Sequence, residues 1–507
     1  MWCPSTCWSL EMSDAIIPTS NRDAGDELAS PPTDSSSDVQ HLGGRVGATS
    51  VVLTVMAFLA PLGAVVGYVP LVIGYGNGLG APAVFLMCGA ILALFLFGFL
   101  AMVRQVPRPG AFYAYVSSGL GKRFGLGSGS LTLVMYLISL GSFQIFGGIA
   151  LSSLLQNGLG VNAPWWVCVT AMTLIVGFCS YRGIDFNVRV LGCIVAVEVV
   201  IIVLFDLAAL ALGARTTLPT EPFTWSAFNS GSVAVAALFA IAFFIGFEST
   251  AIYREEVRNP SRTIPLATYI VTAAIAVFYF VSTYCLITVL GVDKAVSATS
   301  ADPSGSFTAA FSTVLGHTFS QVVAVLVVTS VLASQLAMTN GVSRYVYSFG
   351  VDRVLPSALG AVHHRHGSPH RAAVVTTVLT GVVVILVALS GMDAHVAYGV
   401  FSGVAVFGFE VLMLLVSLAV IVYFRRNRGT GESLWSTVIA PLLSIVCFGW
   451  LLVLSAQRAD VLLGTPTPLT TVLFAVLVGA FVVGVGFASW CALRKPDTFA
   501  RIGRAVV

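Results

Sequence analysis

The sequence predicts an all-α integral membrane protein with about twelve transmembrane helices. Three observations support this prediction: charges are few, apolar segments of spanning length recur along the chain, and basic residues gather in alternate loops. Hydrophobic residues make up 57% of the 507 residues and charged residues only 9%, whereas soluble domains average about 25% charged residues. So few charges cannot cover a water-facing surface, and the surface is therefore expected to face lipid.

A helix needs about 20 mostly apolar residues to cross the hydrocarbon core of a bilayer. Segments of this kind follow one another through the chain, with short loops between them and no appended soluble domain. They cover residues 48–74, 81–103, 131–155, 165–181, 188–212, 232–253, 266–290, 321–347, 372–389, 396–424, 437–454 and 469–493.

The positions of Lys and Arg predict the orientation, because cytosolic loops of membrane proteins carry an excess of basic residues. With both termini inside, all of the 25 Lys and Arg residues except Arg215, Lys294 and Arg458 fall in the tails or in loops that follow even-numbered spans. We therefore expect a multi-pass protein of the cell membrane with cytosolic termini. Residues 1–45 are polar and are expected to form a disordered tail, and residues 494–507 form a second, short tail.

The first and sixth predicted spans carry helix-breaking residues near their middles. The first contains Pro61 and Gly63, and the sixth contains Gly246. Proline removes a hydrogen bond from the helix, and glycine lowers the cost of non-helical angles. Non-helical backbone at membrane depth is tolerated only where it is buried in protein or lines a cavity. The alternative is a simple kink in each helix.

Spans one and six are equivalent members of two five-helix halves, residues 48–212 and 232–424. Interrupted helices in equivalent positions point to a substrate site between inverted-topology repeats. We therefore predict a 5+5 inverted-repeat core, like that of the leucine transporter, with two extra helices over residues 437–493.

Four acids lie inside predicted spans, and no Lys or Arg lies at mid-membrane depth to pair with them: Glu198, Asp206, Glu248 and Glu410. A charged carboxylate there is costly, so such an acid usually faces a cavity or stays protonated. Asp206 lies near the outer face, where its side chain can reach the membrane interface. A protonated acid bonded inside the helix bundle accounts for Glu410. Glu198 and Glu248 are the candidate functional acids.

The sequence gives no motif for an enzyme. It contains no HExxH, no GxSxG and no Walker A loop, and its nine cysteines show no zinc-ligand spacing. Four histidines gather in one predicted cytosolic loop: His363, His364, His366 and His370. A solvated basic loop is the interpretation that we favour there, with a metal site as the alternative. We expect no enzyme activity, no metal, no cofactor and, at a net charge of +3, no nucleic-acid partner.

Three stretches of the sequence resemble the amino acid–polyamine–organocation (APC) superfamily of permeases. The most specific runs from Phe244 to Pro265 and contains Arg254-Glu255-Glu256-Val257-Arg258-Asn259-Pro260; the others cover residues 107–115 and 344–356. The resemblance extends over about residues 48–430. It implies a secondary transporter of amino acids or related amines. A permease for polyamines or another small organic solute is the alternative, followed by a channel or a membrane sensor.

Members of this superfamily bind their substrate where helices one and six unwind. The residues implied here are Pro61, Leu62, Gly63, Ala64, Phe243, Phe244, Gly246 and Phe247. Amides in the first group would face a substrate carboxylate at the positive end of a half-helix. Carbonyls in the second group would accept from an ammonium, and Phe247 would act as a gate. The frequent Gly-x-Gly of the superfamily is Gly63-Ala64-Val65 here, which leaves an amine or another small solute open.

Two routes of ion coupling are implied. Sodium-coupled relatives use hydroxyls on helix eight, where this chain has Ser330 and Ser334. Some proton-coupled relatives have a helix-five lysine near the position of Glu198. A buried acid can load and release a proton during a transport cycle. We therefore favour proton coupling or exchange through Glu198 or Glu248, with sodium as the alternative.

Overall fold

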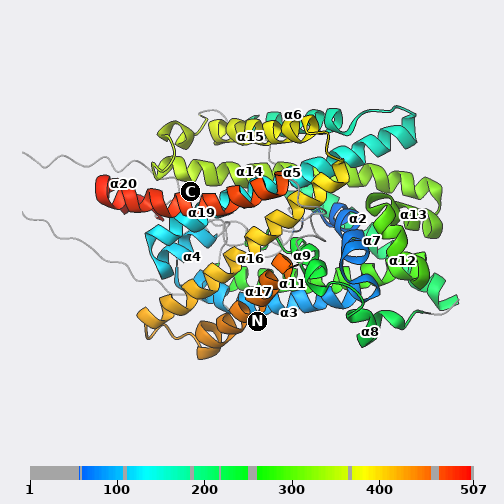
Figure 1. Cartoon of the computed structure of the whole chain (residues 1–507), viewed down its shortest axis with the longest axis horizontal. Helices are drawn as coiled ribbons and strands as arrows, with labels where there is room; N and C mark the ends of the chain where they lie inside the picture. Colours follow the sequence, from blue (N-terminus) through cyan, green and yellow to red (C-terminus); the bar gives the residue numbers. More distant parts are fainter. Residues whose placement is uncertain are drawn as a thin grey trace, which may run out of the picture. The chain divides into compact units, whose positions relative to one another are not determined.

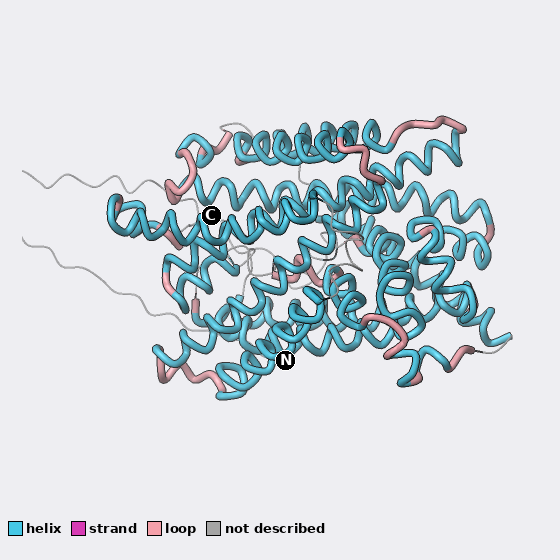
Figure 2. Tube along the Cα trace, in the orientation of Figure 1, coloured by secondary structure: helices cyan, strands magenta, loops and turns pink. Residues whose placement is uncertain are grey.

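The computed structural model describes residues 56, 60–106, 111–182, 188–215, 218–248, 260–363, 368–457 and 468–503. Across these ranges the chain forms helices joined by short loops, without a β-strand, so the all-α prediction is confirmed (Figures 1 and 2). In chain order the helices are α2 (Pro61–Leu71), α3 (Ala81–Gln105), α4 (Ala111–Leu120), α5 (Lys122–Leu159), α6 (Trp165–Arg182), α7 (Val188–Arg215), α8 (Trp225–Phe228), α9 (Val233–Ala242), α11 (Pro260–Leu290), α12 (Val292–Ala301), α13 (Pro303–Leu315), α14 (His317–Val351), α15 (His370–Leu389), α16 (Ala394–Arg426), α17 (Ala440–Gln457), α19 (Pro468–Arg494) and α20 (Pro496–Arg501).

Ten helical stretches of the described chain are long and apolar enough to cross a membrane. Each of the twelve predicted segments overlaps one of the helices above. However, Pro61–Gln105 counts as a single stretch although its backbone is non-helical at Gly76 (φ −97°, ψ −107°), between α2 and α3, and α9 is shorter than a full span. The multi-pass architecture is therefore confirmed, whereas the number twelve stays a prediction.

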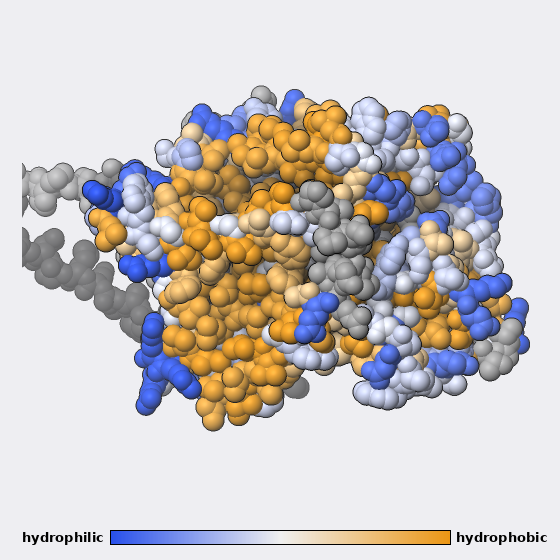
Figure 3. Space-filling view, viewed as in Figure 1, coloured by the Kyte–Doolittle hydropathy of each residue, from blue (hydrophilic) through white to orange (hydrophobic). Residues whose placement is uncertain are grey.

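Large apolar side chains project outward from the helices. Leu174 on α6, Leu386 on α15 and Val483 on α19 are 66%, 60% and 69% exposed. Figure 3 shows a broad apolar surface over the middle of the bundle, with polar residues gathered toward its two ends. In water such a continuous apolar surface would be unfavourable, and lipid tails are the solvent that suits it.

Two helices make especially extensive contacts. The long helix α5 packs against α14, α16 and α19, whereas α3 packs most extensively against α11 and also contacts α17 and α16. Small residues allow close approach at both helices, as is common for membrane helices. A Cβ added to Gly89 of α3 would lie 2.5 Å from the Cβ of Ala276 on α11, and one added to Gly148 of α5 would overlap Val169 of α6. Glycine is therefore required at both contacts.

Helix α9 ends where the sequence predicts a break in helix six. Helix α9 ends at Ala242, and residues 243–248 form turns rather than helix, with Gly246 at φ 117°. A positive φ of this size suits glycine, which lacks the Cβ that would clash. The segment after residue 248 lies outside the described residues until Pro260.

Helix one has its irregular residue slightly earlier than predicted. Ala60 is left-handed, with φ 46°, and α2 starts at the next residue, Pro61. Proline favours the first position of a helix, because its missing N–H would have no partner there. The residues from Pro61 to Ala64 are therefore helical, and the break precedes them.

Different short helices lie at the two ends of the bundle. Helices α4 and α20 lie at one end, and α8, α12 and α13 lie at the other (Figure 1). The predicted tail over residues 494–507 contains α20, and the tail over residues 1–45 lies outside the described part. The division into halves 48–212 and 232–424 stays a prediction.

Candidate substrate site between the interrupted helices

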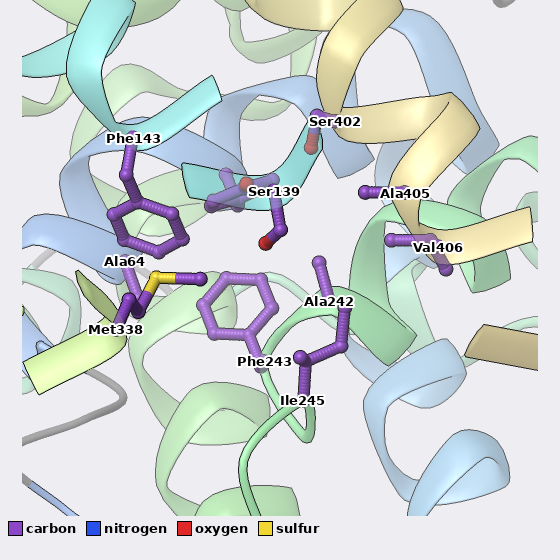
Figure 4. Close-up of a pocket in the computed structure, with 11 residues that line it drawn as sticks. Ala64, Ser139, Phe143, Ala242, Phe243, Ile245, Met338, Ser402, Ala405 and Val406 are labelled. Carbon is purple, nitrogen blue, oxygen red and sulfur yellow. The ribbon is translucent and has the colours of Figure 1, made fainter. Parts of the chain in front are cut away.

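A cavity lies where α2 and the turns after α9 meet α5, α14 and α16 (Figure 4). Its walls come from Ala64, Tyr68, Ser139, Phe143, Ala242, Phe243, Ile245, Met338, Ser402, Ala405 and Val406. The space has room for about one water molecule. In this conformation the space is therefore too small for an amino acid or an amine, and it must widen to admit one.

The wall of the cavity is mostly apolar. Tyr68, Ser139 and Ser402 bring hydroxyl groups to it, and the lining residues include neither a basic nor an acidic side chain. Figure 4 shows the Ser139 hydroxyl pointing into the space beside Phe243 and Ala242. The arrangement suits a small solute with an apolar body and one polar head.

An aromatic cluster holds the wall on the side of α9. The ring of Phe243 lies 4.2 Å from that of Tyr279, 5.1 Å from that of Phe85 and 5.6 Å from that of Tyr68. Edge-to-face and offset pairs at these distances are favourable beyond the area that they bury. The non-helical turn is thus positioned by its own aromatic side chain.

Glu198 of α7 lies at the start of α2. Its Oε2 accepts a hydrogen bond from the Leu62 amide at 3.2 Å, and its side chain is only 2% exposed. Ser330 of α14 is next to the same carboxyl. Because Ala60 offers no capping side chain, Glu198 supplies the acceptor that the positive end of α2 favours.

The first turn of α2 has few amides left to offer a ligand. Pro61 has no N–H, Leu62 donates to Glu198, and Ala64 donates to the Ala60 carbonyl at 2.8 Å. Gly63 is the remaining amide. A Cβ added to Gly63 would lie 2.9 Å from Cγ2 of Val331 on α14. The start of α2 therefore packs directly on α14.

Glu248 closes the turns that follow α9. The Tyr136 hydroxyl of α5 donates to its Oε1, and the Gly246 amide donates to its Oε2 at 3.0 Å. Glu248 is completely buried. It therefore links the non-helical segment to α5, outside the lining of the cavity.

The structure brings together some of the predicted site residues and separates others. Ala64 and Phe243 line the cavity. Pro61, Leu62 and Gly63 lie at the start of α2 beside Glu198 and Ser330, and Ser334 is buried one helical turn further along α14. Phe244 and Gly246 lie in the turn segment outside the lining, and Phe247 is buried among four rings, those of Phe95, Phe99, Phe112 and Phe409.

Sequence reasoning missed the part of the wall that α5, α14 and α16 contribute. Ser139, Met338 and Ser402 lie in regular helical spans without a motif. The hydroxyl groups were the available signal, but serine is frequent in membrane helices for packing reasons alone. Only the packing of the helices identifies these positions.

Two further acids differ from expectation. Asp206 does not reach the membrane interface: it is 6% exposed and accepts from the Ser282 hydroxyl of α11 at 2.9 Å. Helix packing against α11 therefore holds it inside. Glu410 is completely buried, yet neither of its carboxyl oxygens has a hydrogen-bond partner in the described chain. The expected bond within the bundle is therefore not found among the described residues.

Named transporters resemble the chain over most of its length. The low-affinity putrescine importer PlaP of Escherichia coli is 25% identical over 374 residues, which cover 72% of this chain and 78% of that protein. The methylthioribose transporter of Bacillus subtilis is 24% identical, with coverage of 72% and 78%. The branched-chain amino acid permease BcaP of Bacillus subtilis is 23% identical, with coverage of 64% and 69%.

A solved structure and a family model extend this comparison. The crystal structure of the Eremococcus coleocola manganese transporter, in complex with an aromatic bis-isothiourea substituted compound, aligns with a TM-score of 0.57 at 14% identity. It covers 93% of this chain and 99% of that chain. Likeness at this identity concerns the fold alone. The family described as amino acid permease matches residues 44–485. The chain therefore belongs to the amino acid permease family, within the APC superfamily.

Proposed function

We propose that this permease is a secondary transporter of the cell membrane that moves a small amine or amino acid by alternating access, with both termini in the cytosol. The proposal rests chiefly on one observation, the closed cavity between the start of α2 and the turns after α9. A cavity enclosed at mid-bundle is useful to a transporter only if it opens to each side in turn. The family supports transport rather than an enzymatic reaction.

The two interrupted helices provide the moving parts of this proposal. Ala60 precedes α2 with left-handed angles, and Gly246 follows α9 with a positive φ. Non-helical residues of this kind absorb the changes in backbone angle that hinge motions need. Ala64 and Phe243 line the cavity from the two hinged segments, so a hinge motion would reshape the site directly.

Coupling to a proton is the second part of the proposal. Glu198 holds the start of α2 through the Leu62 amide, and Glu248 holds the turn segment through Tyr136 and Gly246. Loss or gain of a proton at either acid changes the strength of these bonds. Each acid can therefore link protonation to the position of a hinged segment. Exchange of two solutes would need the same motion without net proton movement.

Transport by purified protein in proteoliposomes tests the proposal. We expect saturable uptake of at least one small amine or amino acid, with counterflow when unlabelled substrate is loaded inside. A channel would pass solute without counterflow, and a sensor would bind without uptake. A thermal-shift screen would first identify the ligand, because a ligand at 100 times its dissociation constant stabilises a protein by about 2.7 kcal/mol.

A further inference from the structure

We infer that the substrate of this permease is an apolar monoamine without a carboxylate group, because Glu198 of the chain itself occupies the start of α2 where a substrate carboxylate would bind. This inference rests on the proposed function, since it names the class of solute that the cavity takes. It follows from the hydrogen bond of the Leu62 amide, two residues before the lining residue Ala64, and from the groups that line the cavity.

Most amides at the start of α2 are already occupied within the chain. An anion at a helix N-terminus is held by the free N–H groups of the first turn. Here Pro61 has none, Leu62 donates to Glu198, and Ala64 donates within the chain. A substrate carboxylate would retain the Gly63 amide alone, which packs against α14. The anion site is therefore largely filled before any substrate arrives.

A substrate carboxylate would have to displace Glu198 from the Leu62 amide. An oxygen of Glu198 can accept from the Leu62 amide whether the carboxyl is protonated or ionised. A substrate carboxylate that took its place would leave Glu198 buried without its partner, which costs free energy. Two carboxylates in one buried site also repel each other. Both effects disfavour an amino acid relative to the amine of the same shape.

The end of α9 suits the ammonium group of a substrate. Helix α9 ends at the cavity, where Ala242, Phe243 and Ile245 contribute to its lining. The C-terminal end of a helix carries partial negative charge and favours a cation. The carbonyls of the last turn accept from the amides of residues 243–245, and each carbonyl oxygen keeps a second lone pair for an ammonium. No basic side chain lines the cavity to oppose it.

The cavity walls suit a substrate with an apolar body. Tyr68, Phe143, Phe243 and Met338 give the cavity aromatic and thioether walls, which suit an apolar body. A diamine would bring a second ammonium, and the lining residues contain no acid to pair with it. The chemistry therefore fits a monoamine such as 2-phenylethylamine or 3-methylbutylamine.

Matched pairs of solutes test the inference. Four unlabelled solutes would be added as competitors to the uptake assay with wild-type protein in proteoliposomes. They form two pairs, 2-phenylethylamine with phenylalanine and 3-methylbutylamine with leucine. We expect each amine to compete at a concentration at least tenfold below that of its amino acid. The acid 3-phenylpropionate, which has the carboxylate alone, should not compete. Equal or tighter binding of the amino acids would overturn the inference.

Two substitutions of Glu198 sharpen this test. Glu198→Ala removes the oxygen from the Leu62 amide, so the amine preference should fall at least tenfold. Glu198→Gln keeps a side-chain carbonyl oxygen and should retain the wild-type affinity ratio in direct binding. An unchanged ratio in Glu198→Ala would contradict the inference, and the wild-type pairs decide if this variant does not fold. If no solute of either series bound, this inference would fail, and the proposed function would fail as well only if the thermal-shift screen and the uptake assay found no other amine or amino acid. A preference for amino acids overturns the inference alone.

Discussion

At the scale of single residues, Glu198 connects three helices of the candidate site. It comes from α7, accepts from the Leu62 amide of α2 and lies beside Ser330 of α14. The sequence placed this acid at mid-membrane depth without a basic partner, which marked it as a candidate. It could not show that the partner would be a backbone amide, because main-chain donors leave no trace in side-chain patterns.

Replacing Glu198 by Gln should separate exchange from accumulation. The amide keeps the shape and an acceptor oxygen for Leu62, but it cannot load a proton. If Glu198 carries the coupling proton, Glu198→Gln should lose the pH dependence of uptake and fail to concentrate substrate, while still exchanging labelled for unlabelled substrate. Uptake and counterflow in proteoliposomes under an imposed pH gradient measure the two properties separately.

Glu248→Gln is the parallel variant for the turn segment. Full pH-driven accumulation in both single variants would show that neither acid is the proton site. The sodium alternative through Ser330 and Ser334 would then gain support, and uptake should follow a sodium gradient at constant pH.

Gly63 should not tolerate a large side chain. A Cβ there would already lie 2.9 Å from Val331 and 3.6 Å from the Ser330 hydroxyl, so Gly63→Leu would push α2 away from α14 and distort the site. We expect loss of saturable binding, measured by thermal shift with a known substrate. Gly381→Leu on α15 is the matched control, because a Cβ at Gly381 has open space around it. Unchanged binding in Gly63→Leu would place the site elsewhere.

At the scale of elements, the segment after α9 shows how a non-helical turn persists inside a helix bundle. Gly246 provides the positive φ, and Glu248 accepts from the Gly246 amide and from the Tyr136 hydroxyl. Gly246 and Glu248 are visible in the sequence as a helix-breaking pattern. Tyr136 is 112 residues away, and its role depends on how α5 packs against this segment.

Removing the Tyr136 hydroxyl should weaken the attachment of the turn segment to α5. Tyr136→Phe leaves one oxygen of the buried Glu248 without its donor, which should lower the free energy of unfolding by about 1 kcal/mol. Thermal unfolding in detergent measures this loss. Tyr423→Phe on α16 is a suitable control, because the Tyr423 hydroxyl makes no hydrogen bond with the residues that the structure describes. Equal melting temperatures for the two variants would argue against this attachment.

The short helix α20 packs against the end of the bundle where α4 lies. Lys122 donates to the carbonyls of Phe499 and Ala500 at 3.0 and 2.6 Å, and the Gly503 amide donates to the Tyr113 hydroxyl at 2.7 Å. Tyr113 in turn donates to Asp352 at 3.0 Å. The C-terminal segment is therefore attached to α4, α5 and the end of α14.

This attachment should depend on pH. Burial raises the pKa of Asp352 from its ordinary 3.8 to about 6, although the Tyr113 hydroxyl and the charges of Lys122 and Arg501 oppose the shift. In the folded state Asp352 binds its proton more tightly than in the unfolded state. The contribution of this proton to the stability of the fold is therefore complete below about pH 4 and is lost as the pH rises through about 6. The melting temperature should thus fall between pH 4 and 7, and Asp352→Asn should reduce that dependence. An identical pH profile for the variant would contradict this assignment.

At the scale of the whole molecule, the sequence predicted the helices better than their contacts. Apolar segment length reports on each span separately, so the helices followed from it. The end of α9 followed from the helix-breaking Gly246. The walls contributed by Ser139, Met338 and Ser402 depend on how α5, α14 and α16 pack together. Likewise, the chain bends between α2 and α3 at Gly76 (φ −97°, ψ −107°), and a hydropathy pattern does not locate such a bend.

An ion pair joins the end of α3 to the loop between α16 and α17, at the end of the bundle that is predicted to be cytosolic. Nε and Nη2 of Arg104, in the last turn of α3, donate to the two carboxyl oxygens of Glu432 at 2.7 Å each. Gln105 adds a bond to the Thr430 carbonyl at 3.3 Å. Glu432 follows α16, which packs chiefly on α5, whereas α3 packs chiefly on α11. Motion of α16 relative to α3 would therefore stretch this contact.

Breaking the pair should favour opening toward the cytosol. The Arg104 side chain is 33% exposed and that of Glu432 is 12% exposed, so solvent screens the pair and we expect a coupling energy of about 1 kcal/mol. Arg104→Gln and Glu432→Gln should each raise the population of the inward-open state. The double variant should raise it no further than either single variant does. Distances between spin labels on α3 and α16 would measure these populations.

Arg425→Gln is the control for this experiment, because it removes a nearby positive charge at the exposed end of α16. It should leave the spin-label distances unchanged. If Arg104→Gln and Glu432→Gln shift the populations independently and their effects add in the double variant, the two side chains do not act as a pair. The contact would then contribute to folding alone, and the closed state of the cavity would have to be held by the packing of α3 against its neighbours.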